Sequence, residues 1–184
     1  MVFIKIISIF VSNLKYLDMI NKGIRILDKE DIKLYFFGGK GKFILKSNKT
    51  GKWFMYKITK PKDKNNDEIY YISVLLDGNY QYLGIIKIDD IDYIRTQKVK
   101  VDAVHDCISG IKWLLKQFKN DKEFPTDMEF YHMGICCCCA RTLTVKDNIE
   151  LGIGPICFKN YGKKNKRIMR IVKIKDLQKK IKRK

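Results

Sequence analysis

The chain has 184 residues, with 38 lysine and arginine residues, 20 aspartate and glutamate residues and a formal net charge of +18. No apolar run reaches the ~18 residues that cross a bilayer, which argues against a membrane-spanning segment. Six cysteines at metal-ligand spacing argue against a disulfide scaffold and for a reducing compartment.

The N-terminal region, residues 1–34, is predicted to be an extension that leads into a helix. Asp28 can cap this helix, which is expected over residues 28–37, and the glycines that follow end it. Lysines beside these glycines suit a phosphate, but the G-x-x-x-x-G-K-S/T pattern of a nucleotide-binding loop is missing. A helix end and a turn are therefore the favoured interpretation.

Residues 35–127 are predicted to form an antiparallel sheet and one long helix. The polar turn NKTG (48–51) and the hairpin signal DGN (77–79) separate segments typical of strands. The predicted strands are residues 42–47, 52–59, 68–76, 80–88 and 91–96. Strands joined in this order form a meander. The predicted fold class is α+β: an antiparallel β-meander packed by one long helix, followed by a small zinc knuckle and a basic C-terminal tail.

Side chains that alternate along these strands assign the two faces of the sheet. One face of the second strand carries Trp53, Met55 and Lys57. The fourth strand aligns Tyr80, Tyr82, Ile86 and Ile88. Aromatic rings among lysines can stack on nucleic-acid bases, and the candidates are Trp53, Tyr56, Tyr70 and Tyr82. The alternative, that these rings fill the core, stays open.

The long helix is predicted over residues 101–119, with Asp102 as its cap. Its apolar stripe at helical spacing consists of Val104, Ile108, Ile111, Leu115 and Phe118. His105 and Cys107 are two residues apart, so they do not share a helix face. Since no Cys–His pair or other catalytic set emerges, the protein is expected not to be an enzyme.

The segment 128–161 is predicted to be a zinc-binding module, because it holds five of the six cysteines. Neighbouring residues of an extended chain point to opposite sides, so four consecutive cysteines cannot all bind one ion. The two-residue spacing of a zinc knuckle selects Cys136 and Cys139. Cys157, which Pro155 would place in a short helix, is the third predicted ligand, and His132 is the fourth. One structural Zn²⁺ is expected.

A second short helix is predicted between these ligands. Thr144 and Asp147 form a capping-box pattern before the segment VKDNIEL, and Gly152 ends it.

This segment resembles a family of uncharacterised phage-encoded zinc domains. The pattern H-x-G-x-C-x-x-C-x-R-x-L-T followed by G-I-G-P-x-C carries the resemblance. The residues that match the family are Cys136, Cys139, Arg141, Leu143, Thr144, Ile149, Gly152, Ile153, Gly154, Pro155 and Cys157. A glycine segment and a K-S-x-x-T-G turn within residues 36–58 extend the resemblance. One departure is Ala140, where the family has glycine. The resemblance implies a phage setting and brings no established activity.

The last segment, residues 162–184, is predicted to be a basic tail that attracts polyanions. A solvated tail without a partner is the alternative. The predicted nucleic-acid-binding residues, in the sheet, the knuckle and the tail, are Lys46, Lys49, Lys52, Trp53, Lys57, Arg141, Lys163, Lys164, Lys166, Arg167, Arg170 and Lys173.

The favoured function is non-catalytic binding of DNA or RNA by a small basic zinc-binding phage protein. The alternative is a protein-interaction module, such as an inhibitor of a host or defence enzyme, or a packaged virion component. The expected location is the host cytoplasm or the virion. Dependence of nucleic-acid binding on salt would favour the first hypothesis, and a stoichiometric protein complex that survives nuclease would favour the second.

Overall fold

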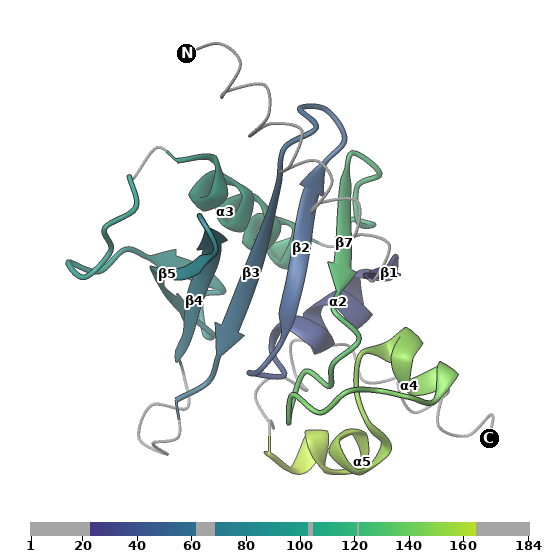
Figure 1. Cartoon of the computed structure of the whole chain (residues 1–184). Helices are drawn as coiled ribbons and strands as arrows, with labels where there is room; N and C mark the ends of the chain where they lie inside the picture. The colour runs from purple at the N-terminus through teal and green to yellow at the C-terminus, as the bar shows by residue number, and fades with distance from the viewer. Residues whose placement is uncertain (1–22, 62–68, 103–104, 121, 165–184) are drawn as a thin grey trace.

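The computed structural model describes residues 23–61, 69–102, 105–120 and 122–164. Its main feature is a seven-stranded antiparallel sheet with the strand order β1-β7-β2-β3-β4-β5-β6 (Figure 1). The strands are β1 (Ile24–Ile26), β2 (Lys42–Ser47), β3 (Trp53–Thr59), β4 (Ile69–Leu76), β5 (Asn79–Lys87), β6 (Asp92–Ile94) and β7 (Met128–His132). The helices are α2 (Lys29–Phe36), α3 (Asp106–Lys119), α4 (Lys146–Leu151) and α5 (Pro155–Lys164).

Strands β2 to β6 are neighbours in chain order, which confirms the predicted meander. The sheet does not end there, because β7 returns after α3 and pairs with β2, and β1 pairs with the outer side of β7. The strand that leads into the cysteines is therefore an internal strand of the sheet. The segment 128–161 therefore begins with a strand, β7, that pairs directly with the first strand of the meander, β2.

Two helices, rather than the single long one predicted, pack on the same face of the sheet. Phe36 of α2 lies 5.5 Å from Phe43 of β2 and 5.4 Å from Phe118 of α3, measured between ring centroids. The expected cap of α2 is present, since the Asp28 carboxylate accepts the backbone N–H groups of two first-turn residues. Helix α2 is short but buries five of its eight residues, so it contributes to the core as a second packing helix.

Helix α3 begins at Asp106, five residues after the predicted start. Its cap is His105, whose Nδ1 accepts the N–H of Cys107 at 3.3 Å, and not Asp102 as predicted. Val104 of the predicted stripe lies outside the described residues, whereas Ile108 and Ile111 are buried as expected. None of the described helices is both long and apolar enough to span a bilayer.

Two of the rings considered for base stacking belong to the core. Tyr56 and Tyr70 are completely buried. Their hydroxyl groups donate to the carbonyls of Cys107 at 2.8 Å and of Phe37 at 3.0 Å. Because these contacts satisfy buried polar groups, both tyrosines hold helices to the sheet and are not available to bases.

The prediction that Tyr80, Tyr82, Ile86 and Ile88 share one face of the fourth predicted strand, β5, is wrong, because β5 contains a β-bulge. The register between β4 and β5 shifts between Ile72 and Ser73. Gly84 lies at this shift with φ 144°, and a Cβ atom there would come 2.5 Å from the carbonyl oxygen of Ile94. As a result, Tyr80 and Tyr82 lie on the face opposite the helices, while residues 86 and 88 remain on the core face.

Candidate metal centre

Three cysteine sulfur atoms meet at one end of the sheet. The Sγ atoms of Cys136, Cys139 and Cys157 all lie within 4.8 Å of one another. The first two belong to the turn that follows β7, and the third lies in the first turn of α5, which begins at Pro155 as predicted. Three thiolates at this separation can hold one metal ion.

The turn that carries the first two cysteines is closed by backbone hydrogen bonds. The N–H of Cys136 donates to the carbonyl of Arg141, and the N–H of Ala140 donates to the carbonyl of Cys136, both at 2.8 Å. An isolated bridge between Ile135 and Thr142 extends the pairing. The sulfur positions are therefore set by a short hairpin, which makes the approach of Cys139 to Cys136 a local property of the sequence.

Hydrogen bonding prepares Cys136 to be a thiolate. The thiols of Cys137 and Cys138 lower the pKa of Cys136 below its ordinary value, and the N–H of Gly154, 3.4 Å from its Sγ, acts in the same direction. Burial raises the pKa of Cys157 to about 12, with a further contribution from the Cys139 thiol. The Cys136 sulfur therefore loses its proton most readily of the three. A bound cation would favour deprotonation of the Cys139 and Cys157 thiols as well.

Cys137 has a structural role that the sequence analysis missed. It is fully buried, and its carbonyl accepts the N–H of Lys40 at 2.7 Å. Its own N–H donates to the carbonyl of Gly152 at 2.9 Å. Gly38 lies so close that an added Cβ would come 2.5 Å from the Cys137 sulfur. This cysteine therefore joins the turn that carries Cys136 and Cys139 to the end of α2.

His132 is not brought together with the three sulfurs. It is buried at the end of β7, where its Nδ1 accepts the N–H of Gly134 at 3.2 Å and its ring lies 5.0 Å from that of Tyr35. Its Nε2 is buried without a hydrogen-bond partner among the described residues. Burial lowers the pKa of His132 to about 4, so the imidazole is neutral at pH 7.

The helix between the ligands also differs in detail from its prediction. Gly152 ends α4 with φ 67°, as expected. At its start, however, the capping residue is Val145, which has no side-chain cap hydrogen bond, and the predicted capping box of Thr144 and Asp147 does not form at this cap.

Three predicted nucleic-acid-binding lysines face carboxylates. Lys46 lies 3.0 Å from Glu129, Lys49 lies 2.7 Å from Asp127, and Lys52 lies 2.5 Å from Asp106. Because each ammonium group already has an anionic partner, the turn between β2 and β3 is less basic than its sequence indicates.

The other predicted nucleic-acid-binding residues are distributed over three regions. Trp53 is partly buried, and Lys57 and Arg141 are exposed. Lys163 and Lys164 belong to the last turn of α5. Lys166, Arg167, Arg170 and Lys173 lie outside the described residues.

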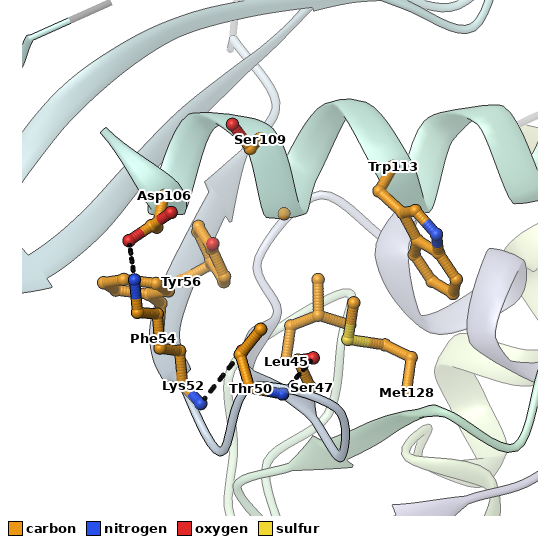
Figure 2. A pocket seen from close by; sticks show the side chains of 11 residues that line it. Leu45, Ser47, Thr50, Lys52, Phe54, Tyr56, Asp106, Ser109, Trp113 and Met128 are labelled. Atoms are coloured by element: carbon orange, nitrogen blue, oxygen red, sulfur yellow. Dashed lines mark hydrogen bonds and ion pairs between the residues drawn. The ribbon is translucent and has the colours of Figure 1, made fainter. Parts of the chain in front are cut away.

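A separate pocket of about 210 Å³ lies between α3 and the turn joining β2 and β3 (Figure 2). Phe54, Trp113 and Met128 contribute apolar walls, and the Lys52–Asp106 ion pair lies at one side. This lining suits an apolar group better than a metal ion.

Comparison with known proteins adds a family match for the cysteine-containing segment. Residues 126–162 match the model of DUF6011, a family of unknown function. The matched segment includes the three clustered cysteines, β7 and α4. No curated protein and no solved structure matches the chain. The similarity therefore covers the candidate metal centre and brings no activity with it.

Replacing Ala140 with glycine is expected to increase the free energy of unfolding by about 0.5–1 kcal/mol. Ala140 has φ 63°, a left-handed conformation that costs an L-residue ~1–2 kcal/mol, whereas the added chain entropy of glycine offsets only ~0.5–1 kcal/mol. Denaturant unfolding at saturating metal would measure the change. Ala140→Val is the control and should destabilise the protein. Stabilisation by valine and not by glycine would contradict the strained turn.

Proposed function

We propose that the chain is a zinc-binding protein that binds nucleic acid without catalysing a reaction, in a phage-infected host. The observation that carries the metal part is the group of three cysteine sulfurs within 4.8 Å. Thiolates on a C-x-x-C turn and a third from a helix are typical ligands of structural zinc. Cys136, Cys139 and Cys157 would hold the ion and tie α5 to the turn after β7.

The nucleic-acid part is supported by charge. The whole chain has a formal net charge of +18, and its last twenty residues contain ten lysine or arginine residues and one aspartate. Since every cation that contacts a phosphate releases a counterion, this density favours salt-dependent binding with little sequence preference. The phage setting rests on the resemblance of the cysteine-containing segment.

A specific observation supports the alternative, a protein-interaction module. Val145 and Ile156, both in the metal-binding segment, expose 56% and 73% of their surface. Exposed apolar side chains on the segment that carries the proposed zinc ligands suit a protein partner. This function is favoured if the purified protein keeps a stoichiometric partner after nuclease treatment.

Removing residues 165–184 is expected to reduce the salt dependence of nucleic-acid binding. If about half of the ten cations contact phosphates, the slope of log affinity against log salt falls by about 3–4 for single strands. Fluorescence anisotropy with a labelled single strand and a labelled duplex, at several salt concentrations, would measure it. Zinc content and the thermal midpoint serve as controls and should not change.

Two outcomes would contradict the proposal in different ways. An unchanged slope would show that the folded residues, and not the tail, make the phosphate contacts. Absence of binding by the full chain to either nucleic acid at 0.1 M salt would overturn the nucleic-acid function itself.

A further inference from the structure

Two lysines face each other on the sheet, and no described residue forms an ion pair with either of them. Lys42 of β2 and Lys57 of β3 are direct partners in the antiparallel register. Like charges placed opposite each other on neighbouring strands are destabilising. Neither lysine forms an ion pair with any residue that the structure describes. Among the described residues, this part of the sheet therefore concentrates positive charge that no carboxylate offsets.

Elsewhere on the same face, one carboxylate lies between two cations. Four residues along β2 from Lys42, Lys46 lies 3.0 Å from Glu129, and Arg25 contacts the other oxygen of the same carboxylate at 3.3 Å. One internal anion thus serves two cations from different strands. The described residues provide no such anion for Lys42 and Lys57.

Tyr80 completes the arrangement. The Nζ atoms of Lys42 and Lys57 lie 5.9 and 5.7 Å from the centre of its ring. Tyr80 belongs to β5, three strands from β2 in the sheet order, so the sheet curves enough to bring this ring to both lysines. Burial raises the pKa of Tyr80, which keeps its hydroxyl protonated and able to donate a hydrogen bond at neutral pH.

An aromatic pair lies on the same face beside the lysines. Ser73, the partner of Lys57 on β4, also pairs with Tyr82 of β5. The ring of Tyr82 lies 6.2 Å from that of Tyr71, which is 39% exposed. Tyr82 is partly buried and supports the exposed ring of Tyr71. An exposed ring beside a cation pair suits an unpaired base attached to a bound phosphate, and a carboxylate-rich peptide has no such base.

We propose that Lys42, Lys57 and Tyr80 form a binding site for a backbone phosphate of single-stranded nucleic acid. The phosphate lies between Lys42 and Lys57, in the way that the Glu129 carboxylate lies between Lys46 and Arg25. Its negative charge relieves the repulsion between the ammonium groups of Lys42 and Lys57. Tyr71 is the adjacent platform for a base. This site rests on the nucleic-acid function proposed above and locates part of it on the folded sheet, away from the basic tail.

The test uses the full chain and a labelled single-stranded thymidine 20-mer, with affinity measured against salt. The double variant Lys42→Gln/Lys57→Gln is expected to reduce the slope by about 1.4, because each lost contact removes about 0.7, and to weaken binding about 25-fold at 0.1 M salt. The control, Lys49→Gln/Lys52→Gln, removes the same net charge from lysines that already face carboxylates. It is expected to leave the slope unchanged.

Equal slopes for the two double variants, with wild-type binding intact, would overturn this site and leave the proposed function standing. Absence of wild-type binding would overturn both. Binding of polyglutamate to the same variants tests whether the site is selective for phosphate. If Lys42→Gln/Lys57→Gln weakens polyglutamate binding as strongly as it weakens oligonucleotide binding, the site accepts carboxylates, and its assignment to phosphate is wrong. Circular dichroism of each variant verifies that it is folded.

Discussion

Replacing Cys139 with serine is expected to abolish the proposed zinc binding and to lower the stability of the protein at saturating zinc. Cys139 is one of the three clustered sulfurs, and a serine hydroxyl is a much poorer ligand for zinc than a thiolate. A ligand present at a thousand times its dissociation constant stabilises the folded state by about 4 kcal/mol, so a loss of this size is expected at that zinc concentration. Elemental analysis and denaturant unfolding measure the two effects.

Two further variants make the result specific. Cys137→Ser should keep one equivalent of zinc, because Cys137 contacts Gly38 and is not part of the clustered group. His132→Asn should also keep the metal, because the histidine lies outside that group. Loss of zinc from His132→Asn would show that the imidazole completes the site. Loss from a Cys137→Ser variant that circular dichroism shows to be folded and equally stable without metal would show that Cys137 is itself a ligand.

Replacing Gly152 with alanine is expected to destabilise the protein by about 3 kcal/mol. Gly152 has φ 67°, and its added Cβ would lie 2.3 Å from the Tyr35 ring, which is completely buried. The left-handed backbone costs an L-residue ~1–2 kcal/mol and overpacking a further ~1–3 kcal/mol. Because the Gly152 carbonyl accepts the N–H of Cys137, a displaced loop should also weaken metal binding.

Gly51 offers a matched control for this substitution. It has the same φ of 67°, but an added Cβ would meet nothing within 4 Å. Gly51→Ala should therefore show the backbone cost alone, about 1–2 kcal/mol, without loss of zinc affinity. Equal destabilisation by the two alanines in denaturant unfolding would show that the contact with Tyr35 does not constrain the loop at Gly152.

Much of the local structure could be predicted from the sequence. The alternation of β2 and β3, the cap at Asp28, the turn at Gly51 and the end of α4 at Gly152 all depend on residues within a few positions of each other. The approach of Cys136 to Cys139 is local in the same sense. Propensity and spacing act over these short distances, so the residues alone determine them.

Contacts between distant segments were decided by the tertiary structure. The carboxylates that face Lys49 and Lys52 lie 78 and 54 residues further along the chain, at Asp127 and Asp106. The net charge of the sequence does not show which lysines Asp127 and Asp106 pair with. His132 separates from the nearby cysteines for the same reason, since its strand is fixed by pairing with β1 and β2.

Strand β5 shows both what the sequence determines and what only the folded sheet decides. The sequence determined that Tyr80 belongs to a strand, but the face of that strand was decided by a bulge at Gly84, where the backbone of Ile94 approaches too closely for a side chain. Side-chain alternation is a property of one strand, whereas register and curvature depend on its partners. Only the folded sheet could therefore bring Tyr80 to Lys42 and Lys57.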